Sequence, residues 1–353
     1  MYQEIFLEFI RLGFIAFGGP AAHVSMMHDR FVVEKKWLDD KHFLDLVSLS
    51  SVIPGPSSTE LVLLIGRHRG GILGLYIAGL SFILPALSMV FGLSYLYVRF
   101  GDVPEIGNIL TLISPVIVAI IMYAIYKLMI KVVKSYVQVV WIIIAFLLAL
   151  MFNQIFVFLI VGLAGGLYPI LFKKRQKLNE LMSVWMIFWL FFQIGGTLYG
   201  SGYVLASYLD TFFVSTNYVS YQQVVDAITV GQITPGPVFT TAGFMGYVLS
   251  GNIVGGIFGA VGIFLPGFLL ITFLYKVMEY LRQAAWFKYV LMTLNAAAIA
   301  LMIHVVIDLT VIDFSLIKLF LTVISFGLLL SKKISTTKLI LISIAISVII
   351  AIT

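Results

Sequence analysis

Apolar residues dominate this chain in continuous runs of about 17–25 positions, separated by short polar segments. A helix of that length crosses the hydrocarbon core of a bilayer at a rise of ~1.5 Å per residue. The strands of an outer-membrane barrel would instead show short segments in which polar and apolar positions alternate. The pattern therefore predicts an all-α polytopic membrane protein with about ten transmembrane helices.

The predicted spans form two series, and each series also contains one broken apolar stretch. The broken stretches are residues 43–65 and 224–249, and a Pro-Gly-Pro tripeptide interrupts each of them. Proline removes a backbone donor and clashes with the preceding helical turn, so neither stretch forms one continuous helix. The predicted spans are approximately 5–18, 72–98, 109–130, 137–151, 155–172, 182–198, 253–277, 290–309, 315–330 and 339–352.

The two Pro-Gly-Pro tripeptides mark an internal repeat. Pro54 recurs as Pro235, 181 positions later, and the same step relates many other residues. A register that persists over most of the chain indicates two copies of one unit. We place the first copy at residues 1–175 and the second copy at 176–353. The step also relates Asp29 to Asp210, Asp45 to Asp226, Gly70 to Gly251, Gly74 to Gly255 and Pro85 to Pro266.

The basic loops decide how the broken stretches sit in the membrane. Loops 30–41 and 67–69 flank the first broken stretch, and both are rich in lysine and arginine. If this stretch dips in and returns as a re-entrant hairpin, the basic clusters all fall on one side, which the positive-inside rule makes the cytoplasm. Five spans per copy, an odd number, would then insert the copies in opposite orientations, as inverted repeats do in many secondary transporters.

Composition excludes several functional classes. The chain is 61% hydrophobic and 11% charged, with no cysteine and five histidines. It carries no nucleotide-binding signature, and its histidines do not pair across spans as haem or metal ligands would. We therefore expect no enzyme activity, no cofactor and no bound metal. The net charge of +6 lies in short loops, so it indicates topology and no nucleic-acid partner.

The candidate binding site lies at the two Pro-Gly-Pro breaks. We call residues Pro54 to Thr59 the first tip and residues Pro235 to Thr240 the second tip. After each break a new half-helix would begin, and its free amides would attract an anion. Two facing helix ends offer about +1 of charge against a divalent oxyanion. The predicted substrate-binding residues are Pro54, Gly55, Pro56, Ser57, Ser58, Thr59, Pro235, Gly236, Pro237, Val238, Phe239, Thr240, Arg11, Gly18 and Gly19. The alternative is that each tripeptide is only a kink.

Two ionisable residues inside predicted helices extend this hypothesis. Arg11 would add positive charge at the site, unless it only neutralises Glu8 three positions earlier. Glu60 follows the first tip directly and would couple transport to a proton, unless it is a structural carboxyl hydrogen-bonded to the backbone.

Several polar residues outside the predicted spans are weaker candidates for a functional role. His23 and His28 lie in a polar segment and are predicted to be interfacial. Residues 67–69 (Arg-His-Arg) are either topology signals or a cytoplasmic funnel that guides anions by their charge.

The first copy carries a set of motifs that returns less sharply in the second. They are Phe17-Gly18-Gly19-Pro20-Ala21-Ala22-His23, Met27-His28, Val33-Glu34-Lys35-Lys36-Trp37, Pro54-Gly55-Pro56 and the small-residue series from Ile65-Gly66 to Leu84-Pro85. This set resembles the chromate ion transporter family, in its long form with two fused homologous halves. The second copy departs from it by having Gly200-Ser201-Gly202 in place of Gly-Gly-Pro.

The resemblance implies a secondary transporter that exports chromate across the bacterial inner membrane and gives chromate resistance. The anion would lie between the two opposed hairpin tips, and the basic loops would be cytoplasmic. A carrier for sulfate or another tetrahedral oxyanion is the alternative, because sulfate has the same shape and charge. Glu60 stands where glutamine is common in that family, which leaves the coupling ion open. The expected partners are the anion, the lipid bilayer and, for the assembly, a homodimer.

Overall fold

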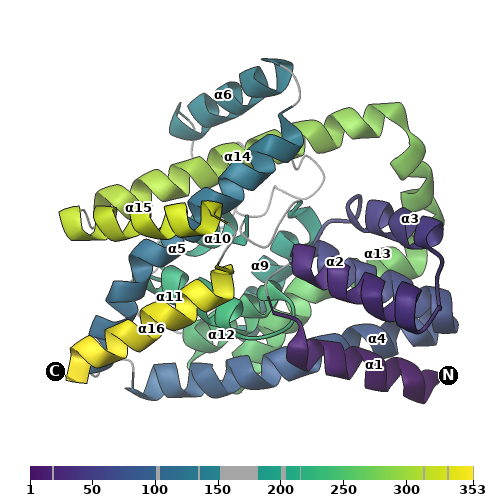
Figure 1. Cartoon of the computed structure of the whole chain (residues 1–353), viewed down its shortest axis with the longest axis horizontal. Helices are drawn as coiled ribbons and strands as arrows, with labels where there is room; N and C mark the ends of the chain where they lie inside the picture. The colour runs from purple at the N-terminus through teal and green to yellow at the C-terminus, as the bar shows by residue number, and fades with distance from the viewer. Residues whose placement is uncertain are drawn as a thin grey trace. The chain divides into compact units, whose positions relative to one another are not determined.

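The computed structural model describes residues 1–17, 20–100, 104–133, 136–151, 182–199, 204–214, 216–312, 315–331 and 334–352. Every regular element in these ranges is a helix (Figure 1), which confirms the all-α prediction. The predicted span 155–172 lies outside the described residues, as do Gly18 and Gly19.

The helices of the first copy come in the order that its apolar runs predict. They are α1 (Tyr2–Ile15), α2 (Pro20–His28), the π-helix η1 (Asp29–Glu34), α3 (Asp40–Ser50), α4 (Ser57–Phe100), α5 (Pro104–Val132) and α6 (Tyr136–Met151). The second copy contains α9 (Val184–Thr197), α10 (Leu205–Leu209), the π-helix η2 (Asp210–Val214), α11 (Tyr221–Ile233), η3 (Val238–Thr240), α12 (Thr241–Ser250), α13 (Ile253–Gln283), α14 (Ala285–Ile312), α15 (Leu316–Leu330) and α16 (Thr336–Ile352).

Two of the described helices contain segments that are long and apolar enough to cross a membrane. These segments are Ser57–Phe100 and Ile253–Leu281. Other apolar helices are shorter, among them Val184–Thr197 and Leu316–Leu330. The starts of α13, α15 and α16 fall within a few residues of the predicted span starts, because continuous apolar runs bounded by Gly, Asn and Ser delimit a helix clearly.

Local backbone features recur at the repeat step. The π-helices η1 and η2 begin at Asp29 and Asp210, which are 181 positions apart. Within the described ranges, Lys36 (φ +51°) and Asn217 (φ +62°) have positive φ without being glycine, and they too are 181 positions apart. Such conformations are uncommon for side-chain-bearing residues. Their recurrence indicates that the two copies share local structure as well as sequence pattern.

The chain divides into two compact units. Unit 1 comprises Met1–Leu96, Met182–Gly202 and Val230–Lys288, and unit 2 comprises Tyr97–Leu181, Tyr203–Thr229 and Tyr289–Thr353. Each unit takes segments from both copies. Both tips belong to unit 1, so the candidate site is described within that unit alone. The copy boundary between residues 175 and 176 stays a prediction.

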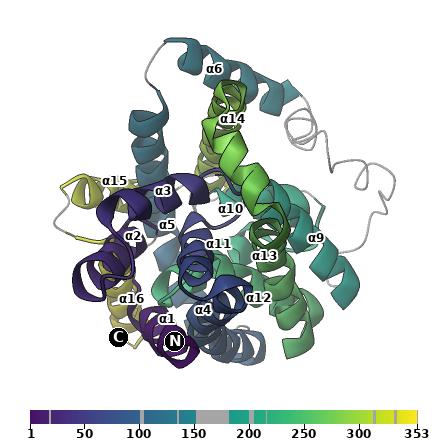
Figure 2. The ribbon, with the colours of Figure 1, turned by 90° about the vertical axis from the view of Figure 1, so that its right-hand side faces the viewer.

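Unit 1 builds the same helix pair twice, and glycines allow both pairs to approach closely. Helix α1 lies against α4, where a Cβ on Gly13 would come within 2.7 Å of the Phe82 carbonyl oxygen. Helix α9 lies against α13, where a Cβ on Gly195 would come closer still to the Ile263 carbonyl oxygen (Figure 2). Only residues without a side chain permit such backbone contact.

Helix α4 reverses direction at Gly70 and Gly71, where Gly71 has φ +64°. Gly66 consequently lies beside Gly74, and a Cβ on Gly66 would be 2.6 Å from the Gly74 carbonyl oxygen. Residues eight apart in a straight helix would be about 12 Å apart. The part of α4 before the turn, residues 57–69, therefore runs antiparallel to the part after it.

The second copy repeats this reversal between α12 and α13. Gly251, with φ +71°, ends α12, and the Asn252 side chain caps α13 by accepting from the amides of Val254 and Gly255. Gly246 then lies against Gly255, as Gly66 lies against Gly74 in the first copy.

Unit 2 holds α5, α6, α15 and α16, together with α10, η2 and most of α11 and α14. Helix α5 packs against α15 and α16. The Thr322 hydroxyl of α15 donates to the Pro115 carbonyl of α5 at 3.2 Å. On α11, the Asp226 carboxylate accepts from the Tyr97 hydroxyl at 2.7 Å and from the Gln222 amide at 2.9 Å. These side-chain bonds satisfy polar groups that apolar packing would otherwise leave unpaired.

Candidate functional site

Both tips interrupt their helices, as the two prolines require. Helix α3 ends at Ser50 and α4 begins at Ser57, while α11 ends at Ile233 and η3 begins at Val238. The central glycines have strongly positive φ, +119° at Gly55 and +91° at Gly236. Residues with a side chain rarely adopt this region, so glycine is required there. The tips are also buried, and only Ser57 is partly exposed.

Each tip is hydrogen-bonded to the first helix of the other copy. The Gly55 amide donates to the Leu198 carbonyl at 2.8 Å, and the Gly236 amide donates to the Ala16 carbonyl at 2.9 Å. Ala16 directly follows α1, and Leu198 directly follows α9. The carbonyls at helix C-termini have no partner within their own helix. The two copies therefore exchange equivalent hydrogen bonds.

The predicted set of free amides at the tips is partly wrong. The Thr59 amide already donates to the Pro56 carbonyl at 2.6 Å, and the Thr240 amide donates to the Pro237 carbonyl at 3.0 Å. The amides of the preceding residues, Ser57–Ser58 and Val238–Phe239, lie before the first intrahelical acceptors. Two amides per tip, rather than three, therefore remain for a ligand.

Buried polar atoms without a partner accompany the first tip. Thr59 is 1% exposed and Glu60 is 2% exposed. Neither the Thr59 Oγ1 nor the Glu60 Oε2 has a hydrogen-bond partner, and the same holds for the buried Nε2 of Gln193 on α9. Folded proteins leave few buried polar atoms unpaired. A group of them in unit 1 marks this region as the candidate binding site.

The Glu60 carboxyl lies between two glycines. A Cβ on Gly55, or one on Gly267 of α13, would be 2.6 Å from the Glu60 Oε1. The residue equivalent to Glu60 in the second copy is Thr241, whose hydroxyl donates to the Val238 carbonyl at 2.6 Å. The first copy alone therefore has a carboxyl at this position.

His23 is buried, and the prediction that it is interfacial is wrong. Its side chain is 1% exposed and makes an edge-on contact with Phe82. Its Nε2 donates to the Ala16 carbonyl at 2.9 Å, the same oxygen that accepts from the Gly236 amide. Because a carbonyl only accepts, we assign the proton to Nε2, which leaves Nδ1 as an acceptor. No local pattern indicates this burial, because the polar residues that follow His23 in the chain favour an interfacial segment.

His28, by contrast, is half-exposed, and its interfacial position stays a prediction. Its Nε2 lies 2.8 Å from the Asp40 carboxylate, and its Nδ1 lies 3.6 Å from Asp29. The hydrogen bond to Asp40 raises the pKa of the His28 imidazole above its usual range, with a smaller contribution from Asp29.

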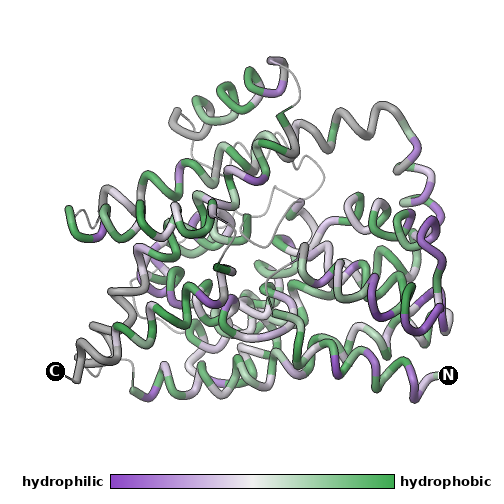
Figure 3. Tube along the Cα trace, viewed as in Figure 1, coloured by the Kyte–Doolittle hydropathy of each residue, from purple (hydrophilic) through white to green (hydrophobic). Residues whose placement is uncertain are grey.

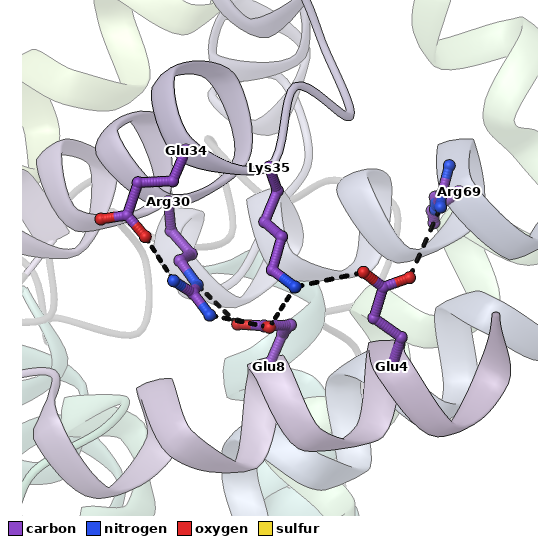
Figure 4. Close-up of polar contacts among 6 residues, drawn as sticks. All are labelled: Glu4, Glu8, Arg30, Glu34, Lys35 and Arg69. Atoms are coloured by element: carbon purple, nitrogen blue, oxygen red, sulfur yellow. Dashed lines mark hydrogen bonds and ion pairs between the residues drawn. The ribbon is translucent and has the colours of Figure 1, made fainter.

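Arg11 and Glu8 do not pair as the alternative interpretation of Arg11 expected. Arg11 lies on the exposed side of α1. The Glu8 carboxylate instead accepts from Arg30 at 2.6 and 2.8 Å, and it lies 2.9 Å from the Lys35 ammonium (Figure 4). Arg11 therefore remains the predicted additional cation.

The contacts of Glu8 belong to a larger charged network. It joins α1, η1 and the first part of α4, in the region where hydrophilic residues gather around η1 (Figure 3). Its members are Glu4, Glu8, Glu34, Arg30, Lys35 and Arg69 (Figure 4). Three acidic and three basic side chains neutralise one another, so these cations have little charge left to attract an anion.

Arg67 has a structural partner that neither sequence interpretation anticipated. Its guanidinium donates to the carbonyls of Ile271 and Thr272 on α13 and lies over the Tyr275 ring, 4.6 Å from its centroid. Helix α13 departs from helical geometry at Leu274, which frees carbonyls in the turn before it. Arg67 therefore caps a helix break.

The two ends of the first broken stretch lie together. The ring of His42, near the start of α3, is 4.5 Å from the ring of His68, near the end of the first part of α4. A surface pocket of about 500 Å³ opens beside them, and Lys36 and Trp37 contribute to its lining. The chain thus enters the first tip and returns from it on the same side of unit 1.

Comparison with known proteins shows the family to which the chain belongs. A family model described as chromate transporter matches residues 3–168 and 185–351, one region within each predicted copy. The chain is 27% identical to an uncharacterised transporter of Methanocaldococcus jannaschii, over 96% of this chain and 92% of that protein.

Two similar proteins have names that state a substrate. The chain is 29% identical to a chromate transport protein of Cupriavidus metallidurans, over 76% of this chain and 72% of that protein. It is 26% identical to a chromate transport protein of Pseudomonas aeruginosa, over 79% of this chain and 74% of that protein. No solved structure matches the chain.

Proposed function

We propose, because the chain belongs to the chromate transporter family, that it exports chromate across the bacterial inner membrane by secondary transport and so gives chromate resistance. The family match over both copies carries this proposal. The curated relatives named for chromate transport support the substrate. The absence of a nucleotide-binding signature from the sequence favours energy from an ion gradient or from the membrane potential.

The anion binds between the two tips in this proposal. A fully deprotonated tetrahedral oxyanion accepts hydrogen bonds and donates none, so its site must consist of donors. The tips supply the amides of Ser57–Ser58 and Val238–Phe239, and the unpartnered hydroxyl of Thr59 adds another donor. The two helix ends contribute about +1 of charge. The remaining charge comes from Arg11.

Each broken stretch is a re-entrant hairpin, and the two hairpins approach from opposite sides of the membrane. The close approach of His42 and His68 supports the first hairpin. The exchanged hydrogen bonds of Gly55 and Gly236 support an arrangement in which the copies, residues 1–175 and 176–353, are related by inversion. The basic loops then face the cytoplasm.

Transport into everted membrane vesicles tests the function directly. In such vesicles, export from the cell becomes uptake, so vesicles that contain the protein should accumulate labelled chromate faster than control vesicles. Excess sulfate in the medium distinguishes the two candidate substrates. Strong competition by sulfate would indicate a general tetrahedral-oxyanion carrier, because amide donors recognise shape and charge that both anions share. Uptake no faster than in control vesicles would overturn the proposal.

A further inference from the structure

The two copies differ at one pair of contacting positions near the tips. The first copy has Glu60 where the second has Thr241, and the second copy has Gly267 where the first has Ala86. At the second tip, a Cβ on Gly236 would lie only 2.8 Å from the Cβ of Ala86 in the first copy, so a methyl group fills the space there. Around the first tip, the corresponding space beside Gly55 and Gly267 holds the Glu60 carboxyl. Glycine at 267 thus makes room for a carboxyl.

The Glu60 carboxyl has almost no polar groups around it that could stabilise a negative charge. Glu60 is 2% exposed, its Oε2 has no partner, and its hydrogen bond is to its own backbone amide. An ionised carboxylate in such surroundings is costly, and a carboxyl usually takes up a proton instead.

No opposite charge faces Glu60 from the elements packed around it. Helix α9 carries no ionisable side chain, and the phenol of Tyr199 beyond its end is neutral at neutral pH. On α13, Lys276 and Glu279 are exposed and lie well past Gly267. On α4 itself, Arg67 is bound to the α13 carbonyls. Arg11 of α1 is exposed and does not pair with Glu60, so none of these side chains compensates an ionised Glu60.

Glu60 lies so close to the proposed anion site that its protonation state affects how well an anion binds. It follows Thr59 directly, within one helical turn of the Ser57 and Ser58 amides that the proposed function assigns to the ligand. A carboxylate there would repel a dianion, because two like charges interact strongly in a low-dielectric site. A neutral carboxyl would not repel it.

We propose that Glu60 is a proton-binding site that is occupied when the oxyanion is bound, so that one proton and one dianion are transported together. The proposal rests on the proposed function. In the binding step the dianion binds beside the protonated Glu60 carboxyl, and the proton leaves that carboxyl when the anion is released. One net negative charge then moves per cycle, and an inside-negative membrane potential favours its export.

Anion binding to the purified full-length protein at several pH values tests this coupling, with chromate and sulfate as the probes. Proton binding and anion binding are linked reciprocally. If the anion binds only when Glu60 carries its proton, the anion affinity falls about tenfold for each pH unit above the pKa of that carboxyl. Glu60→Gln mimics the neutral acid. It should bind the anion at high pH as tightly as the parent protein does at low pH, without the pH-dependent loss. Comparing the two proteins removes the anion's own protonation from the result.

Glu279→Gln is the matched control, because it removes a carboxylate from an exposed position of α13. It should keep the parental pH dependence. The proposal is overturned if Glu60→Gln keeps that dependence too.

Infrared spectroscopy separates failure of this inference from failure of the proposed function. At neutral pH the parent protein should show the carbonyl stretch of a protonated carboxyl, and Glu60→Gln should lose it while Glu279→Gln retains it. If no anion binds at any pH but this band behaves as expected, the proposed oxyanion function fails while the buried proton site stands. An unchanged spectrum in Glu60→Gln would show that Glu60 is ionised and would overturn the inference.

Discussion

The amide of Gly236 donates a 2.9 Å hydrogen bond to the carbonyl of Ala16, 220 positions earlier in the chain. The Gly55 amide and the Leu198 carbonyl form the equivalent bond at 2.8 Å. Each tip therefore completes the C-terminus of the other copy's first helix, whose last carbonyls have no internal partner. In each copy, the glycine amide of the tip and the carbonyl at the C-terminus of the first helix have their hydrogen-bond partners in the other copy. A shift of one tip would therefore strain or displace the end of the first helix of the other copy.

Replacing Gly55 or Gly236 with valine should abolish transport. Positive φ costs a residue with a side chain roughly 1–2 kcal/mol. A Cβ on Gly55 would also meet the Glu60 carboxyl at 2.6 Å, and one on Gly236 would meet the Ala86 methyl at 2.8 Å. Vesicle uptake measures the effect, and membrane extraction followed by size-exclusion chromatography reports folding.

Gly92→Val is the control for these two variants, because no atom lies within 4 Å of a Cβ at this helical position. It should transport at the parental rate. Parental rates in both folded tip variants as well would mean that the anion does not bind between the tips and that the repeated tripeptide has only a structural role.

Replacing the Glu60–Gly267 contact of the first tip with the residue types of the second tip should show that these two positions are energetically coupled. Gly267→Ala alone puts a methyl group 2.6 Å from the Glu60 carboxyl and should destabilise the protein by about 1–3 kcal/mol. Combining it with Glu60→Thr reproduces the residue types found at the second tip, Thr241 and Ala86. The double variant should recover much of the loss. The free energies of unfolding in detergent of the parent, the two single variants and the double variant give the coupling energy. Strictly additive effects would contradict a contact between residues 60 and 267.

Cysteine labelling tests the inverted arrangement, and the chain contains no native cysteine to interfere. Ile72 and Ile253 occupy equivalent positions after the helix reversals and are 53% and 50% exposed. A membrane-impermeant maleimide should label Ile72→Cys from the cytoplasm, together with the exposed Lys41→Cys at the start of the first hairpin. Ile253→Cys should be labelled from outside. Labelling of Ile72→Cys and Lys41→Cys from opposite faces would show that the first broken stretch crosses the membrane.

The His28 imidazole should titrate above the usual histidine range of about 6.5. Its hydrogen bond to Asp40 favours the charged form, so the folded-state pKa is raised. The stabilisation from this pair is therefore complete below the unfolded pKa and is lost as pH rises through the folded pKa. Nuclear magnetic resonance of histidine-labelled protein measures the titration. Asp40→Asn should lower the pKa of His28, and an unchanged titration in that variant would contradict the assigned cause.

The sequence predicted what depends on local patterns, namely the helices, the breaks at both tips and the repeat step. It could not predict pairings that depend on how distant segments meet. Nothing near His23 indicates that its partner is the carbonyl that accepts from Gly236, and nothing near Arg67 indicates a broken turn in α13. Both side chains are polar residues next to charged loops, so their sequence context favoured an interface for each. Their burial or capping role follows from tertiary packing, which a local pattern does not encode.

Arg11→Gln should weaken oxyanion binding about tenfold to a hundredfold, the usual range for a lost hydrogen bond to a charged group. Glu8 is engaged with Arg30 and Lys35, so Arg11 is not neutralised by it. An arginine inside an apolar helix needs a polar partner at that depth, and an anion on its path between the tips would provide one. Lys41→Gln is the control, since it removes an exposed charge near the start of α3 and should leave the affinity unchanged. Binding of chromate to the purified variants decides the matter. Equal affinities for Arg11→Gln, Lys41→Gln and the parent protein would remove Arg11 from the site and leave the helix ends as its source of positive charge.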